Sequence, residues 1–177
     1  ASVAVTKARK LVEKDGVDLL VGPLTGAEGY AVGEFARQNK VIDFVTAGSD
    51  ALTKWDKSEY VLRNWVSSSG PSHPFADYAY KKLGWKTVAL IGSDYAYPHE
   101  GVGGFHYRFE DLGGKVVKRV WTPPGAPDFG PYLPQLPKDV DGIFAVLAGG
   151  DAIRFVEAYA TYGFKGKVPL AGHWNVT

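Results

Sequence analysis

The chain contains no cysteine and no methionine among its 177 residues. Without cysteine, disulfide scaffolds, thiolate zinc sites, iron–sulfur clusters and cysteine nucleophiles are excluded. Without methionine, the native start is not represented, so we expect a processed chain or a fragment. No apolar run approaches the roughly 18 residues that a membrane-spanning helix needs, so direct membrane insertion is not expected.

Neither sign of charge predominates, because the chain has 20 basic and 19 acidic residues and a formal net charge of +1. Such a balanced surface creates no strong field for nucleic acid or anionic lipid, so neither is an expected partner. The 45% share of hydrophobic residues is that of an ordinary globular protein.

Hydrophobic periodicity predicts helices that alternate with short strands. The first helix carries Ala1, Val5, Ala8 and Val12 on one face. Strands are expected at residues 17–21, 41–45, 87–91, 116–121, 143–147 and 168–171, with further helices near 25–36, 75–83, 102–112 and 152–159. Single helices between strands imply right-handed crossovers and mainly parallel sheets, so the predicted fold class is α/β.

Two interruptions divide this alternation. After the polar loop 47–59 and an apolar run at 60–66, Ser67-Ser68-Ser69-Gly70-Pro71 has the composition of a hinge. Residues 122–137 hold six of the 11 prolines, which predicts an ordered surface loop with at most a short helical turn at 132–136. We therefore expect two partial three-layer lobes, with residues 1–70 in an N-terminal lobe and 71–177 in a C-terminal lobe. Because the chain opens directly in a helix, it is expected to be an internal piece of something larger.

Glycines follow the predicted strands at comparable places, within about two residues of each strand end: Gly22, Gly48, Gly92, Gly149, Gly150 and Gly172. In open α/β sheets, ligands bind beyond the carboxyl ends of strands, where glycine allows close backbone approach. Each glycine alone is equally consistent with a tight turn. Their repetition favours a shared ligand-binding edge.

The sequence Thr25-Gly26-Ala27-Glu28 matches a capping box, in which the Thr25 and Glu28 side chains each accept from a backbone N–H group. The N–H groups of Gly26 and Ala27 are also suited to a ligand carboxylate at the helix N-terminus. Both interpretations stay open at this point.

Signals for an enzyme or a metal site are weak. His99 and His106 are seven residues apart, too far to share one metal, and the other two histidines have no neighbouring ligand. The sequence contains no nucleophile elbow, Walker loop or H-E-x-x-H motif. Asp94 and Glu100 are interpreted as solvated loop acids. No catalytic residue, metal or cofactor is expected.

Aromatic residues lie in or beside the predicted loops: Trp55, Trp65, Tyr95, Tyr97 and Trp174. Trp65 is expected to pack in the core. Tyr97 and Trp174 follow strands, where aromatic side chains would form the apolar wall of a ligand pocket.

The order of the segments resembles the extracellular solute-binding proteins of the leucine/isoleucine/valine-binding type, which have the type I periplasmic binding fold. The resemblance runs from about residue 5 to residue 175. It is carried by residues 8–12, 16–23, 46–53, 60–63, 78–84, 88–91, 128–129, 133, 136 and 141–144.

That resemblance implies a periplasmic or extracellular protein that closes two lobes on a small solute and delivers it to the membrane permease of an ABC transporter. Residues matching the family's carboxylate-holding loops are Thr25, Gly26, Ala27, Ala47, Gly48 and Ser49. Tyr97 matches an aromatic residue that covers the ligand. Gly149, Gly150, His173 and Trp174 match residues that complete the pocket from the other lobe.

The sequence also departs from the family's pattern. His173 and Trp174 stand where amino-acid binders usually place an acidic residue for the ligand ammonium, and Gly26 and Ala27 stand where serine is frequent. An amino-acid ligand would therefore need Glu100, Asp94 or a missing segment to pair with its ammonium. The expected ligand is an amino acid or a carboxylate, with a slight preference for an aromatic or aliphatic carboxylate or another small polar solute. Two alternatives are a ligand-sensing domain of the same fold in a signalling or regulatory protein, and an α/β enzyme that binds flavin or nicotinamide.

Overall fold

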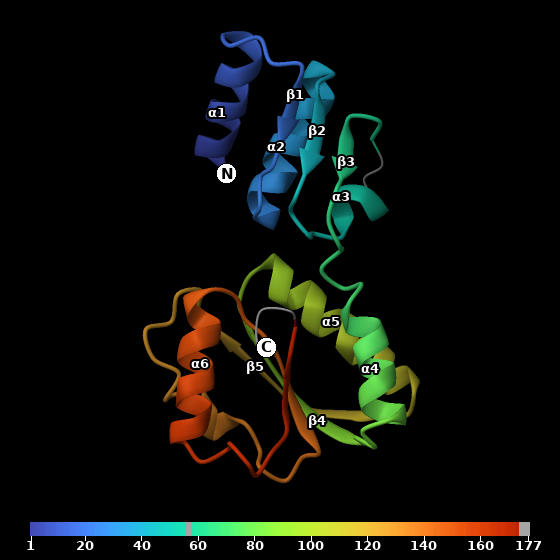
Figure 1. The fold of residues 1–177 in the computed structure, drawn as a ribbon, viewed down its shortest axis with the longest axis vertical. Coiled ribbons are helices and arrows are strands. Elements are labelled where there is room, and N and C mark those ends of the chain that lie inside the picture. Colours follow the sequence, from blue (N-terminus) through green and yellow to red (C-terminus); the bar gives the residue numbers. More distant parts are fainter. Residues whose placement is uncertain (56–57, 174–177) are drawn as a thin grey trace. The chain divides into compact units, whose positions relative to one another are not determined.

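The computed structural model describes residues 1–55 and 58–173, and the chain divides into two compact units, Ala1–Ser68 and Ser69–Thr177. Each unit contains one sheet, and all strand pairs in the described residues are parallel. The predicted α/β class is confirmed (Figure 1). Among the described residues, no helix combines the length and apolar character needed to cross a bilayer.

The N-terminal unit has a three-stranded sheet in the order β1-β2-β3. Its elements are α1 (Ser2–Glu13), β1 (Leu19–Val21), α2 (Gly26–Asn39), β2 (Ile42–Val45), α3 (Ala51–Lys54) and β3 (Val61–Arg63). The apolar run expected at residues 60–66 thus supplies a short edge strand. Because the strand order follows the chain order, each crossover lies on the same face of the sheet.

Helices cover one face of this sheet. Leu20 of β1 packs with Ala8 of α1 and with Val32 and Phe35 of α2, while Val61 of β3 belongs to a neighbouring apolar cluster. The middle strand places Asp43 in register between Leu20 and Val61, so its side chain lies on this same covered face.

Asp43 is completely buried, and neither of its carboxylate oxygens has a hydrogen-bond partner in the part of the chain that the structure describes. Burial disfavours the charged form of the carboxyl and raises the pKa of Asp43 to about 6. A buried carboxyl group that is ionised and has no hydrogen-bond partner destabilises the fold, and at neutral pH Asp43 is such a group among the described residues.

The opposite face of the N-terminal sheet is apolar and largely exposed. Leu19, Val21, Ile42, Phe44 and Leu62 alternate with the covered residues, and Val21 is 75% exposed. This unit therefore shows two layers, one sheet and one layer of helices. Parallel sheets normally have both faces covered.

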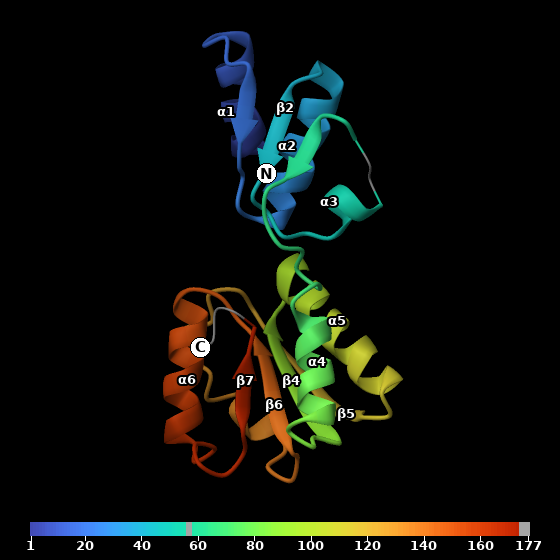
Figure 2. The same ribbon diagram turned by 45° about the vertical axis from the view of Figure 1, so that its right-hand side comes forward.

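The C-terminal unit has a four-stranded sheet in the order β5-β4-β6-β7. Its elements are α4 (Ser72–Lys81), β4 (Thr87–Ser93), α5 (Ala96–Asp111), β5 (Lys115–Thr122), η1 (Leu133–Gln135), β6 (Gly142–Val146), α6 (Gly150–Thr161) and β7 (Leu170–Gly172). Figure 2 shows α6 on one side of this sheet and α4 and α5 on the other. The short turn η1 lies where the sequence predicted one inside the proline-rich loop.

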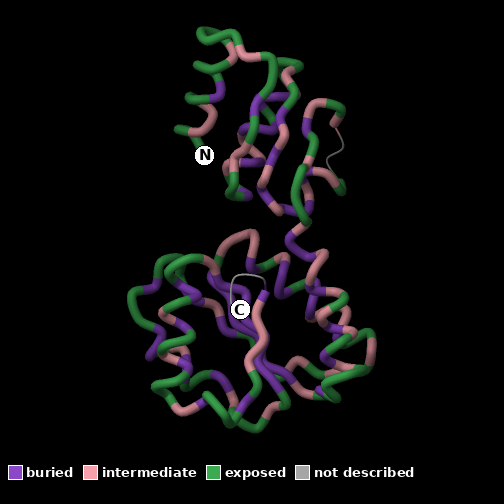
Figure 3. The backbone as a smooth tube through the Cα atoms, in the orientation of Figure 1, coloured by how far each residue is buried: buried purple, intermediate pink, exposed green. Residues whose placement is uncertain are grey.

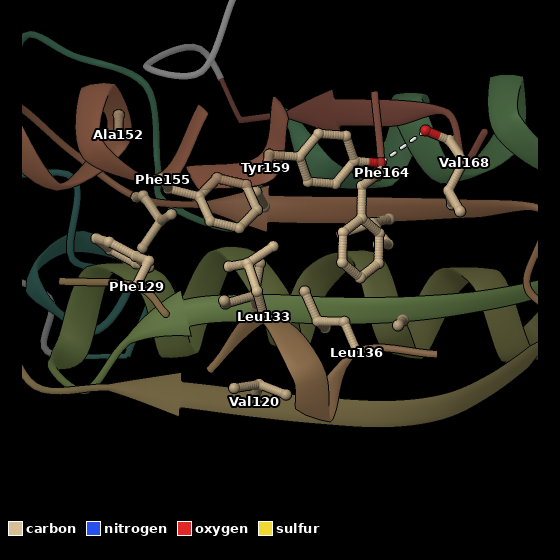
Figure 4. Packing of buried hydrophobic residues seen from close by; sticks show 14 of the residues in the cluster. Val120, Phe129, Leu133, Leu136, Ala152, Phe155, Tyr159, Phe164 and Val168 are labelled. Carbon is tan, nitrogen blue, oxygen red and sulfur yellow. Dashed lines mark hydrogen bonds between the residues drawn. The ribbon is translucent and has the colours of Figure 1, made fainter. Parts of the chain in front are cut away.

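The central strands β4 and β6 are buried on both faces of the sheet, as the burial colours in Figure 3 show. On the α6 side, Phe129, Leu133 and Leu136 of the proline-rich loop pack against Phe155 and the strands (Figure 4). The Tyr159 hydroxyl donates a 2.6 Å hydrogen bond to the carbonyl of Val168, which ties α6 to the segment before β7. The loop is thus an integral part of the core.

The other face is built on aromatic stacking. The ring of Phe144 on β6 stacks on Phe105 of α5 and on Phe75 of α4, with centroid distances of 4.4 and 5.5 Å. Trp85 packs edge-on against Phe75 at 6.1 Å and lies over Gly142, the first residue of β6.

Gly142→Ala should destabilise the protein by about 2 kcal/mol, because a side chain at this position overpacks the core. An added Cβ would lie 2.4 Å from the ring of Trp85, which is itself buried. Urea unfolding would measure the loss, with Gly103→Ala as the control because a Cβ there meets nothing within 4 Å. A Gly142→Ala protein as stable as the control would contradict this packing argument.

Candidate ligand-binding site

The predicted residues of the N-terminal unit gather at the carboxyl ends of β1 and β2. The Gly22–Pro23 peptide bond after β1 is cis. The hydroxyl of Thr46, which follows β2, donates a 3.0 Å hydrogen bond to the carbonyl of Pro23. This bond joins the two strand ends on which Thr25, Gly26, Ala27, Ala47, Gly48 and Ser49 lie.

The capping box predicted at the start of α2 is wrong in its detail. Thr25 is the N-cap residue, but its side chain makes no hydrogen bond to the helix backbone. Its hydroxyl instead donates to a carboxylate oxygen of Glu28 at 2.8 Å. A hydroxyl and a carboxylate placed three residues apart can satisfy each other directly, and here that bond replaces the two reciprocal bonds to the backbone.

Arg63, at the end of β3, fixes the loop after β2 by hydrogen bonds to its carbonyl groups. Its Nη1 donates to the carbonyls of Gly48 and Ser49 at 2.9 and 2.8 Å. Because peptide groups are planar and trans, these two carbonyls direct the N–H groups of Ser49 and Asp50 away from Arg63. Ala47 and Ser49 are buried. Sequence reasoning missed Arg63, since only the folded register brings it beside this loop.

In the C-terminal unit, Tyr97 and His173 are joined across α5 and β7. The Tyr97 hydroxyl lies 2.7 Å from His173 Nδ1, and the two rings meet edge to face with centroids 5.4 Å apart. Tyr97 is in the first turn of α5, while His173 follows β7 and is 2% exposed. Trp174, also predicted for this site, lies outside the described residues.

Gly149 is the N-cap residue of α6 and has a φ of +56°, a backbone conformation that favours glycine. Beside it, the buried Asp151 carboxylate accepts from the Ser93 hydroxyl at 3.1 Å, the Gly125 N–H at 3.0 Å and Arg154 Nη2 at 2.5 Å. Arg154 Nε also donates to the carbonyl of Ala126 at 2.9 Å. This network, which sequence reasoning missed, fixes the α6 N-terminus to the end of β4 and the proline-rich loop.

Tyr95, the N-cap residue of α5, lies close enough to Asp151 for the carboxylate charge to affect the pKa of the Tyr95 phenol. Burial, with a smaller contribution from the Asp151 charge, raises the pKa of the Tyr95 phenol. Tyr95 therefore stays neutral at physiological pH and can serve as a hydrogen-bond donor.

Several other expectations are corrected or extended by the structure. Trp65 does not pack in the core and is 52% exposed, because it lies in the segment after the edge strand β3. Asp94, interpreted as a solvated acid, lies 2.7 Å from His99 Nε2, and His99 stacks on Trp121 with ring centroids 3.9 Å apart. No group of three or more potential metal ligands occurs within the described residues.

A cavity of about 480 Å³ lies elsewhere in the C-terminal unit, lined by α6 and by residues 165–170. It is at the end of the sheet where β7 begins, whereas His173 follows the other end of that strand. The candidate ligand-binding residues therefore do not belong to this cavity.

Comparison with known proteins identifies the family of this chain. A family model described as periplasmic binding protein matches residues 1–175. The chain belongs to the periplasmic binding protein family. Members of this family are binding proteins and not enzymes, which agrees with the lack of catalytic motifs in the sequence.

Solved structures of the family share the fold. An ABC transporter substrate-binding protein from Sphaerobacter thermophilus is 37% identical, with a TM-score of 0.89 over 97% of this chain and 48% of that one. A solute-binding protein of an ABC transporter from Rhodopseudomonas palustris HaA2, in complex with p-hydroxybenzoic acid, is 32% identical, with a TM-score of 0.92 over 99% and 48%. An R. palustris protein in complex with benzoate is 26% identical, with a TM-score of 0.90 over 99% and 49%.

The chain thus spans about half the length of the solved relatives that it matches. A comparison with curated proteins found no match.

Proposed function

We propose that this chain is part of the substrate-binding component of an ABC importer and captures a small carboxylate without altering it. Two relatives that match 99% of the chain at 26% and 32% identity were solved with benzoate and p-hydroxybenzoic acid, and this observation carries the proposal. Residues 1–70 would belong to one lobe and 71–177 to the other. The family supports a periplasmic or extracellular location and a membrane permease as the partner.

The N-terminal edge supports carboxylate recognition. Arg63 holds the carbonyls of Gly48 and Ser49, so the adjoining N–H groups face the other way and can donate to an anion. Gly26 and Ala27 begin α2, whose N-terminus carries a partial positive charge that stabilises anions.

The C-terminal edge favours an aromatic carboxylate over an α-amino acid. His173 is buried against Tyr97 at the position where the resemblance would place an acid for the ligand ammonium. The Asp151 carboxylate of the same unit already accepts three hydrogen bonds from the protein. A ligand ammonium buried there without an anion would be unfavourable, while the Tyr97 ring suits an aromatic solute.

Titration of the protein with benzoate, 4-hydroxybenzoate and leucine, followed by calorimetry and thermal shift, tests the proposal. We expect the benzoates to bind and to raise the melting temperature, with leucine giving a smaller response or none. Ser49→Ala and Tyr97→Ala should each weaken binding by about tenfold, as expected for one lost hydrogen bond or aromatic contact.

Tyr107→Ala is the matched control for Tyr97, because Tyr107 is an exposed tyrosine on the same helix. If a broad panel of aromatic and amino acids produced no response in the unaltered protein, the carboxylate assignment would be wrong.

A further inference from the structure

Two buried hydroxyl groups lie beside the loop that follows β2. Ser49 is 0% exposed and Ser68 is 1% exposed. Within the described residues, neither Ser49 Oγ nor Ser68 Oγ has a hydrogen-bond partner. Buried hydroxyls are almost always hydrogen-bonded, so two orphaned ones flanking the same glycine indicate a missing polar partner.

Ser68 reaches this place because the chain returns after β3. Its backbone N–H donates a 2.7 Å hydrogen bond to the carbonyl of Gly48. A Cβ built on Gly48 would lie 2.9 Å from Ser68 Oγ, so the hydroxyl is packed directly against the glycine backbone. Glycine at position 48 therefore leaves the space that the Ser68 hydroxyl occupies.

The positive charge of Arg63 lies on the carbonyl side of this loop, 2.9 and 2.8 Å from the oxygens of Gly48 and Ser49. The surroundings thus combine two hydroxyl donors with a nearby cation. An anionic oxygen is the partner that both kinds of group favour.

We propose that Ser68 is an additional ligand-contacting residue, whose hydroxyl donates, together with that of Ser49, to a carboxylate oxygen of the bound solute. This inference rests on the proposed function, because it assigns a further residue to the same site. No sequence signal singled out Ser68, which lies in a serine-rich segment that composition alone interprets as a hinge.

The experiment is calorimetric titration of the full chain with 4-hydroxybenzoate and with benzoate. Ser68→Ala should raise Kd for both by about 10- to 100-fold, the effect of losing one hydrogen bond to a charged group. Ser72→Ala is the control, because its hydroxyl is equally buried and orphaned but lies in the first turn of α4; its Kd should stay within about twofold.

Gly48→Ala provides a second variant that leaves the serine in place. Its added methyl should displace the Ser68 hydroxyl and weaken binding to a similar degree. In a Ser68→Ala background the same change should have much less effect, because the displaced oxygen is already gone. This coupling distinguishes a shared contact from general damage to the fold.

Unchanged Kd in both Ser68→Ala and Gly48→Ala would overturn the role of Ser68 while the proposed function stands. Absence of carboxylate binding in the unaltered protein would overturn both. An effect of Ser68→Ala on stability alone, with Kd preserved, would assign the hydroxyl to an internal water instead.

Discussion

Asp43→Asn should raise the free energy of unfolding by about 3 kcal/mol at pH 7.5. Asp43 lies at the centre of the N-terminal sheet, fully buried, with no partner for either carboxylate oxygen among the described residues. Its pKa in the folded protein is raised to about 6 from an ordinary value of 3.8, so ionisation opposes folding. Asparagine has nearly the same shape and removes the charge.

The pH dependence follows from the direction of this shift. Between the ordinary pKa and about 6, the folded protein binds more protons at Asp43 than the unfolded protein does. The stability that the protein has with Asp43 neutral is therefore fully present below the ordinary pKa, and it is lost as the pH rises to about 6 and the carboxyl ionises. The Asp43→Asn protein should lack this loss, so the two proteins should differ little at pH 4 and most above pH 6.5.

Urea unfolding at several pH values between 4 and 8, followed by circular dichroism, would measure the difference. Asp18→Asn is the control, because it removes an equal charge from an exposed position in the same unit. A difference between Asp43→Asn and the unaltered protein that does not change with pH would show that the Asp43 charge is not the cause.

Asp151→Ala should destabilise the C-terminal unit by about 3 kcal/mol, since hydrogen bonds to a charged group contribute about 1.5–3 kcal/mol each. The substitution removes the acceptor of the Ser93, Gly125 and Arg154 donors. The Ser93 hydroxyl, which is completely buried, would lose this partner. The N-terminus of α6 and the proline-rich loop would then be less firmly connected.

Two further variants separate the network from the charge alone. Asp151→Asn keeps one acceptor oxygen and should recover about half of the lost stability. Glu157→Ala, at an exposed acid on the same helix, should leave stability within about 0.5 kcal/mol. The Asp151→Ala protein should also show a lower pKa for Tyr95, measured by absorbance, because the Asp151 charge helps to raise it. Equal stability of the Asp151→Ala and Glu157→Ala proteins would contradict the proposed role of the network.

Much of the fold could be predicted from the pattern of apolar residues. The runs around Ile91 and Phe144 are fully buried in central strands, and strands buried on both faces are nearly continuous in apolar residues. The short turn η1 was predictable because prolines rule out a longer helix there. Asp43 was not predictable, because its burial depends on which face of the strand α2 covers.

The candidate site was predictable only where it is local in sequence. Glycine and polar residues directly after strands pointed to Gly48 and Ser49, and their role as ligand contacts stays a prediction. Arg63 contacts Gly48 from 15 residues away, and Ser93 contacts Asp151 across 58 residues. Such pairings depend on strand register, which periodicity does not specify. Thr25 and Glu28 show the converse. The sequence contains the capping-box motif, but the Thr25 hydroxyl donates to the Glu28 carboxylate and not to the helix backbone.

The exposed apolar row on the N-terminal sheet has a practical consequence for laboratory work with this polypeptide. Non-specific association of concentrated samples commonly starts at exposed hydrophobic surface of this kind. In residues 1–177, Val21 and Leu62 point away from the helix-covered side, so changing them to threonine would increase the solubility of this polypeptide in chromatography and crystallisation. Threonine retains the branched shape that strands prefer. The alternation of side chains thus separates the positions exposed in this polypeptide from those that pack against its helices.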